Sequence, residues 1–232
     1  MTVDLARRAT GLVELMDDPD CDLAALRRTY AVFPVVNALV AGWRRVYTTR
    51  LRPLLDPDRE TRLLDLGSGG GDVARSLARW AARDGLRLSV TGADPDERAH
   101  DFATSRPAAG VTYRRASSDE LVAAGDEFDV VVSNHVLHHL DDGARAAVLR
   151  DSELLAGRLV VHNDIRRSRV AYAAYRVGTL PLARSSFVHV DGLRSIRRSY
   201  TVDELGVVAP EGWRVETLAP FRVLLTWTAA GS

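Results

Sequence analysis

The sequence predicts an α/β protein with a mainly parallel sheet that finishes in an antiparallel hairpin. From about residue 60 onward, short apolar runs alternate with helical patterns, which is typical of parallel strands joined by helices. The last two extended runs are separated by only Ala-Pro-Phe, with no helical pattern between them. A length of 232 residues suits one domain, or one domain with a small appendage.

Five short apolar runs predict the parallel strands. Those runs are Arg62–Leu66, Leu88–Ala93, Val111–Arg115, Phe128–Ser133 and Arg158–His162. The fourth run contains three consecutive valines and is apolar on both faces, as expected for a strand covered by helices on each side. Apolar residues from Ala74 to Ala81 recur at helical spacing, and Thr201–Glu204 matches a capping box that begins another helix.

Both ends of the chain depart from this alternation. Trp213–Leu218 and Arg222–Thr228 should pair antiparallel, which brings the sheet to seven strands. Residues 1–55 predict a helical cap, although Pro34 should break or kink its main helix. The longest apolar tract, Val32–Trp43, has about 12 residues, too few to cross a bilayer. Acids stand where a secretory signal would need an apolar stretch, so we expect a soluble, cytoplasmic protein without membrane insertion.

The composition excludes several classes of function. Lysine and arginine together number 31, as do aspartate and glutamate, so no basic excess is present to attract nucleic acid. All the basic residues are arginine, and the missing lysine excludes a Schiff-base enzyme, a Walker A loop and a Tyr-x-x-x-Lys dehydrogenase. The one cysteine, Cys21, excludes a disulfide framework and multi-cysteine zinc sites.

The most informative segment is LLDLGSGGGD, from Leu63 to Asp72, which leaves a predicted strand and enters a predicted helix. Its glycines let the backbone turn sharply and let a ligand approach the amide groups. Two patterns describe it. One, G-x-G-x-x-A from Gly69, matches the dinucleotide fingerprint, and the other, D-x-G-x-G-x-G, begins at Asp65.

The second pattern resembles motif I of the class I S-adenosylmethionine (SAM) methyltransferases, in which the loop wraps the methionine and ribose of SAM. The resemblance implies that Asp94, at the end of the second strand, accepts both ribose hydroxyls with its two oxygens. It also places Asn134 at the end of the fourth strand, where open α/β sheets bind ligands. The full set implied for SAM binding is Asp65, Gly67, Ser68, Gly69, Gly71, Asp94, Pro95, Ser117, Ser118 and Asn134.

The resemblance covers roughly residues 55–229 and implies a Rossmann-like seven-stranded sheet with helices on both faces. It divides the chain into a cap, residues 1–55, and a SAM-binding domain, residues 56–232, with a substrate-covering insertion at about 165–200. One departure concerns adenine. Many relatives carry an Asp at the position of Ser117, so adenine recognition falls to Ser117, Ser118 or Asp119.

Three histidines follow the fourth strand in HVLHHLDD, beside the expected position of the methyl group. If the acceptor is a hydroxyl, a base must remove its proton, and histidine titrates near neutrality. Similar sequences occur in small-molecule O-methyltransferases, and the resemblance implies His138 or His139 as the base, supported by Asp164 after the fifth strand. His189, a base in the substrate, or no base at all remain alternatives, since paired histidines can simply cap a helix.

A metal site at His135, His138, His139 and Asp164 fits by ligand type. No zinc spacing recurs, however, and adjacent histidines should point to different faces, so we expect no metal.

The sequence therefore predicts a SAM-dependent methyltransferase of the branch that contains ubiquinone, menaquinone and secondary-metabolite enzymes. Its acceptor should be a small apolar or aromatic metabolite, methylated at the oxygen of a phenol, hydroquinone or polyketide-like hydroxyl. C-methylation of a quinol ring, an NAD-dependent oxidoreductase and a non-catalytic SAM-binding protein stay open as alternatives. The oligomeric state is also open, with a homodimer as one option.

Overall fold

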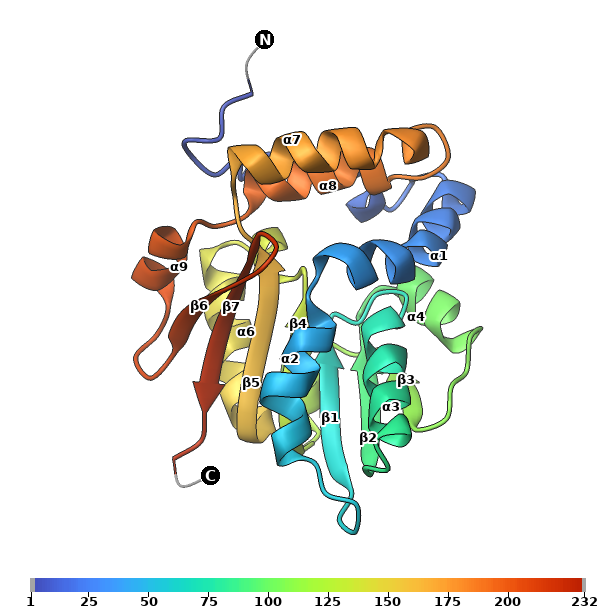
Figure 1. The fold of residues 1–232 in the computed structure, drawn as a ribbon, viewed down its shortest axis with the longest axis vertical. Helices are drawn as coiled ribbons and strands as arrows, with labels where there is room; N and C mark the ends of the chain where they lie inside the picture. The colour runs from blue at the N-terminus through green and yellow to red at the C-terminus, as the bar shows by residue number, and fades with distance from the viewer. Residues whose placement is uncertain (1–2, 231–232) are drawn as a thin grey trace.

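The computed structural model describes residues 3–230, and in that part of the chain seven strands form one sheet (Figure 1). The strand order is β3-β2-β1-β4-β5-β7-β6, and of these strands β7 alone runs in the opposite direction to the other six. The strands are β1 (Thr61–Leu66), β2 (Leu88–Ala93), β3 (Val111–Arg114), β4 (Phe128–Asn134), β5 (Ala156–Ile165), β6 (Arg214–Leu218) and β7 (Arg222–Thr228). The predicted parallel sheet and its closing hairpin are confirmed.

The observed strands agree with the predicted runs except at β5. That strand begins directly after the preceding helix and pairs with β7 as far as Ile165, so it is longer than the apolar run indicated. Residues His162 to Asp164 near the end of this strand are polar, so an apolar pattern could not show that the strand continues through them. All three side chains are nevertheless buried.

Helices cover both faces of the sheet, as predicted. They are α1 (Leu23–Val40), α2 (Trp43–Val46), α3 (Asp72–Arg83), α4 (Glu97–Thr104), α5 (Ser118–Ala123), α6 (Asp142–Leu155), α7 (Arg169–Gly178), α8 (Val188–Arg198) and α9 (Val202–Val208). Shorter turns are η1 (Leu15–Asp17), η2 (Tyr47–Leu51), η3 (Arg52–Leu54), η4 (Leu137–His139) and η5 (Leu180–Leu182). One core joins the sheet to α2, η2 and α3, a second joins it to α5, α6 and α9, and a third, smaller core packs α1 against α4. The capping box at Thr201 begins α9.

Helix α1 runs without a break through Pro34. Pro34 is exposed, and its ring leaves the carbonyl of Tyr30, four residues earlier, without the usual helical donor. With 18 residues and a mean hydropathy of 1.2, α1 is long and apolar enough to cross a membrane, a test that core helices also pass. Its Ala25, Leu26 and Tyr30 are buried in the fold.

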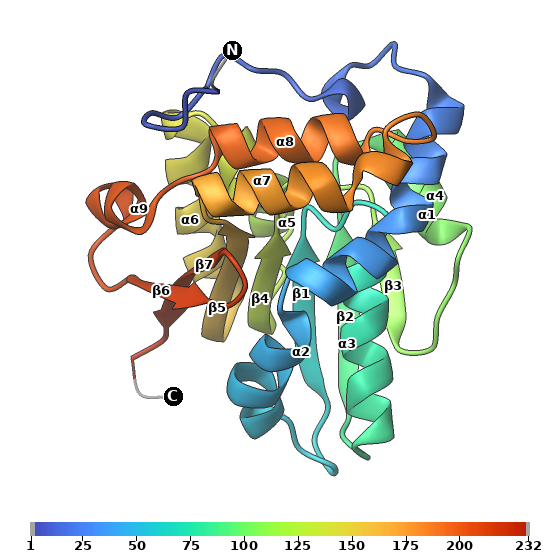
Figure 2. The same cartoon turned by 45° about the horizontal axis from the view of Figure 1, so that its top comes forward.

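The carboxyl ends of the parallel strands lie under a cover made from two distant parts of the chain. Figure 2 shows α7 and α8 crossing this edge of the sheet, with α1 beside them. Residues 43–54 instead pack against a face of the sheet, through Trp43, Tyr47 and Leu51. A cover of this kind suits a substrate site, and its role in binding an acceptor stays a prediction.

The glycine loop offers a direct test of the fold. Gly71 has a φ of +74°, and a Cβ there would lie 2.6 Å from Cε1 of Tyr113. Gly71→Ala should therefore cost more than the roughly 1–2 kcal/mol of a left-handed residue alone. The matched control is Gly85→Ala, because Gly85 has a φ of +70° but open space around it. We expect urea unfolding to show a larger loss for the Gly71 variant; equal losses would contradict the close packing of this loop.

Candidate active site

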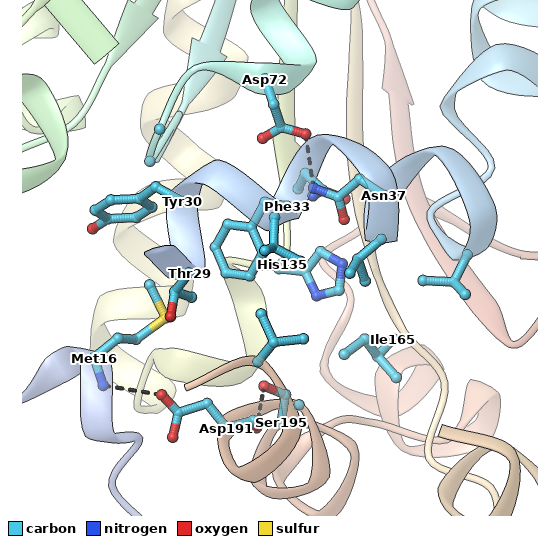
Figure 3. A pocket seen from close by; sticks show the side chains of 18 of the residues that line it. Met16, Thr29, Tyr30, Phe33, Asn37, Asp72, His135, Ile165, Asp191 and Ser195 are labelled. Carbon is cyan, nitrogen blue, oxygen red and sulfur yellow. Dashed lines mark hydrogen bonds between the residues drawn. The ribbon is translucent and has the colours of Figure 1, made fainter. Parts of the chain in front are cut away.

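A cavity of about 1170 Å³ lies under the cover, at the carboxyl ends of the strands. The loops after β1, β2 and β4 form its floor, and α1, α7 and α8 form its walls. Figure 3 shows Tyr30 and Phe33 of α1 and His135 after β4 around this space. Open α/β sheets bind ligands at this edge, where the strand order reverses between β1 and β4.

The glycine loop forms one end of the cavity. Gly67, Gly69 and Gly71 all have positive φ, which the tight turn from β1 into α3 requires. A Cβ at Gly69 would meet only Tyr30, at 3.9 Å, so the backbone there is open to a ligand. The Asp94 carboxylate faces this loop and accepts hydrogen bonds from the amides of Gly69 (2.8 Å) and Asp96 (3.0 Å).

Two further acids lie behind the loop. Asp65 is buried, and neither of its carboxylate oxygens has a hydrogen-bond partner in the described chain. Burial raises the pKa of Asp65 well above its usual value, and the neighbouring Asp72 adds to the rise. Asp72 accepts a hydrogen bond from the side-chain amide of Asn37 at 2.9 Å (Figure 3). A buried carboxyl without partners on a cavity wall, as at Asp65, fits a ligand with hydrogen-bond donors or positive charge.

The charge of the cavity lining is strongly one-sided. Seven carboxyl side chains line it, at Glu14, Asp17, Asp65, Asp72, Asp94, Asp96 and Asp191. Arg222 is the one arginine among the described lining residues. This distribution favours a ligand that carries positive charge over one that carries a pyrophosphate.

Arg222 holds together the strand ends at the opposite side of the cavity. Its buried guanidinium donates to the Oδ1 atoms of Asn134 (3.0 Å) and Asn163 (2.8 Å), and to Nε2 of His135 (2.9 Å). Burial lowers the pKa of Arg222 to about 10, although the Asp164 charge opposes this effect. Burial and the Arg222 charge also hold the pKa of His135 well below its usual value, so that its imidazole is neutral.

His138 and Asp164 meet as the sequence predicted, but away from the cavity surface. Asp164 Oδ1 lies 2.6 Å from His138 Nδ1, and Oδ2 accepts the His138 amide at 2.9 Å. Burial alone would lower the pKa of His138, but Asp164 and Glu14 outweigh it and raise this pKa to about 9. An imidazole enclosed in this way does not suit a general base, which must reach the acceptor's proton.

His139 is the predicted catalytic histidine that lines the cavity. Its Nδ1 lies 3.1 Å from Asp17 Oδ2, and its Nε2 lies 3.8 Å from Glu14 Oε1. Glu14 is buried, accepts a hydrogen bond from Ser195 Oγ at 2.8 Å, and faces Nε2 of His138 at 3.4 Å.

The remaining predicted residues divide into two groups. Pro95 and Ser68 line the cavity with the glycine loop. Gly71 and the two serines expected near the adenine, Ser117 and Ser118, are not among its described lining residues. Ser117 caps α5 in a capping box with Glu120, and the Ser118 hydroxyl donates to Asp151 at 2.5 Å, so both hydroxyls already have local partners.

Sequence reasoning missed Glu14, Asp17 and Arg222. The two acids lie more than a hundred residues from the histidines that they contact, and no motif marks them. Arg222 is the first residue of the predicted strand β7. An arginine at the end of an apolar strand was the one sequence feature that could have marked it as a functional residue.

Comparisons with known proteins agree with this geometry. Residues 63–156 match a family model described as "Methyltransferase domain". The ubiquinone biosynthesis O-methyltransferase of Cereibacter sphaeroides is 30% identical over 173 residues, which cover 68% of each chain. The enzyme of the same name from Rhizobium leguminosarum is 40% identical over 84 residues. That alignment spans 35% of this chain and 31% of the relative, so about a third of the relative's length is matched.

Two solved structures share the fold. Human N-acetylserotonin methyltransferase in complex with SAM has a TM-score of 0.60 at 14% identity, covering 91% of this chain and 57% of that one. The plantazolicin methyltransferase BpumL in complex with S-adenosylhomocysteine (SAH) has a TM-score of 0.59 at 13% identity. The match covers 89% of this chain and 94% of that one.

The Arg222 network predicts a large effect of a conservative substitution. A lysine at this position would keep the charge, but one ammonium cannot reach Asn134, His135 and Asn163 together. Arg222→Lys should lower the free energy of unfolding by about 2–4 kcal/mol, because buried partners are left unsatisfied. Arg214→Lys, at an exposed position on β6, should change it by less than about 0.5 kcal/mol. Equal urea midpoints for the two variants would contradict the network.

Proposed function

The chain belongs to the class I SAM-dependent methyltransferases, and we propose that it transfers the methyl group of SAM to a hydroxyl of a small aromatic metabolite. One observation carries the proposal: a single cavity joins the acidic glycine-loop end to an apolar end under the cover. The acceptor class is a phenol, a hydroquinone or a polyketide-like hydroxyl. Secondary metabolism and a cytoplasmic location are parts of the same proposal.

The residues at the glycine-loop end fit SAM. Asp94 presents its carboxylate beside the open backbone of Gly69, which suits the two ribose hydroxyls. The orphaned oxygens of Asp65 suit the ammonium of the methionine part. The four lining carboxyls of this end, Asp65, Asp72, Asp94 and Asp96, match a ligand with a sulfonium and an ammonium, whereas NAD would bring two phosphates. When bound, SAM supplies an activated methyl group for in-line displacement.

The other end of the cavity fits the acceptor. Ile165, Ala174 and Tyr175 provide apolar and aromatic wall area, and His135 and His139 supply polar contacts near the end of β4. His135 accepts from Arg222 through Nε2, so the proton of its neutral ring is on Nδ1 and can be donated to an acceptor oxygen. The task of these residues is to exclude water and align the hydroxyl with the methyl carbon.

The cofactor assignment is tested at Asp94. Asp94→Ala removes a charged acceptor from the ribose, which should weaken SAH binding by about 1.5–3 kcal/mol, or roughly 10- to 150-fold. Isothermal titration measures this change. The control is Asp101→Ala on the exposed side of α4, which should bind SAH like the wild type. Tight NAD binding by a protein that does not respond to SAH would contradict the proposal.

The acceptor end is tested by a pair of substitutions on α7. Ala174 lines the cavity and Ala173 is an exposed neighbour outside the lining. Ala174→Trp should fill the acceptor end, and we expect at least a tenfold loss in kcat/KM for SAH formation with a phenol or hydroquinone. SAH affinity should stay within about twofold of the wild type. Ala173→Trp should retain both properties; equal turnover by the two variants would place the acceptor elsewhere.

A further inference from the structure

We propose that Glu14, His138 and His139 form a binding site for a divalent metal ion of the zinc type at the acceptor end of the cavity. One ligand atom from each of these side chains lies within 4.8 Å of the others. The residues come from the start of η1 and from η4, two segments that meet only in the fold. Two imidazoles and one carboxylate are a donor set that suits zinc and similar divalent ions.

The two printed distances within this trio leave room for an ion between the ligand atoms. Glu14 Oε1 lies 3.4 Å from His138 Nε2 and 3.8 Å from His139 Nε2. A charge-assisted hydrogen bond between such groups would be about 2.7–2.9 Å long. Two ligands that each lie about 2.0–2.1 Å from a tetrahedral zinc ion are about 3.4 Å apart.

His138 Nε2 supplies an independent observation. The side chain of His138 is 0% exposed, and its Nε2 has no hydrogen-bond partner within the described residues. Buried polar atoms without partners are rare in folded proteins. Glu14 Oε1 lies 3.4 Å from this nitrogen without forming a hydrogen bond, and an ion bound by both atoms would satisfy it.

Each of the three side chains is held by a second polar group. His138 Nδ1 is paired with Asp164 at 2.6 Å, and His139 Nδ1 with Asp17 at 3.1 Å. Glu14 accepts a hydrogen bond from Ser195 at 2.8 Å. Histidines that bind metals characteristically direct their other ring nitrogen to a carboxylate, which fixes the ring and leaves Nε2 for the ion.

The site has a closed side and an open side. His138 is enclosed, whereas Glu14 and His139 line the cavity, so the fourth position of an ion faces the acceptor. This step rests on the proposed methyl transfer. A phenolic oxygen at that position would have its pKa lowered, and its proton would pass to solvent. The oxygen then forms the new carbon–oxygen bond as the bond from sulfur to the methyl carbon breaks, which leaves SAH.

Cobalt(II) provides a probe of the site that does not depend on activity. The full-length protein, treated with a chelator and then titrated with Co²⁺, should bind one equivalent and develop the visible absorption of a four- or five-coordinate ion. Glu14→Gln and His139→Ala should each weaken this binding at least 100-fold. His100→Ala on α4 removes a histidine outside the trio and should not change it. Equal binding by the wild type and both trio variants would overturn the proposal.

Two further measurements keep the test decisive. If a trio variant does not fold, anomalous scattering from a zinc-soaked wild-type crystal should place a peak between Glu14, His138 and His139, and a peak elsewhere would overturn the site. SAH titration of the same protein separates the two proposals. SAH binding without Co²⁺ uptake would contradict the metal site alone, and Co²⁺ uptake without SAH binding would contradict the proposed function alone.

Discussion

The candidate active site depends on the buried guanidinium of Arg222, which connects the ends of three strands, β4, β5 and β7. Arg222 begins β7, the antiparallel strand, and reaches Asn163 on β5 and Asn134 on β4. It also contacts His135, whose φ of +62° turns the chain away from β4 toward the histidines of η4. The terminal hairpin therefore also positions the loop after β4, because the Arg222 guanidinium donates hydrogen bonds to Asn134 and His135.

The cavity beside this network has two chemically different halves. Around the glycine loop, Asp65 and Asp72 are buried and Asp94 is partly buried, and burial raises the pKa of each. Such a wall is costly without a ligand that brings donors or positive charge. The half beneath α7 has apolar side chains such as Ile165 and Ala174 on its surface, beside Glu14 and His139. A cationic methyl donor and an apolar acceptor divide the space in the way these walls favour.

The sequence predicted most of the frame because apolar periodicity and turn chemistry are local. Runs such as Phe128–Ser133 and the capping box at Thr201 therefore gave elements close to those observed. At Pro34 local chemistry predicted a break or kink; the helix does not break there, and α1 continues to Val40.

The site was only partly predictable, for physical reasons that differ from residue to residue. Asp94 and the loop glycines follow from one motif, and the pairing of His138 with Asp164 follows from strand order. Whether a side chain faces a cavity depends on what packs over it, and Glu14 of the amino-terminal segment closes His138 away from the surface. Local sequence patterns cannot predict this contact, because Glu14 and η4 are more than a hundred residues apart in the chain.

A crystal structure of the protein with SAH tests the central claim most directly. The account predicts that SAH lies along Gly67–Gly71, with its ribose hydroxyls on Asp94 and its sulfur directed toward Asn134 and the apolar half of the cavity. SAH bound outside this cavity, or inside it with the ribose away from Asp94, would contradict the account.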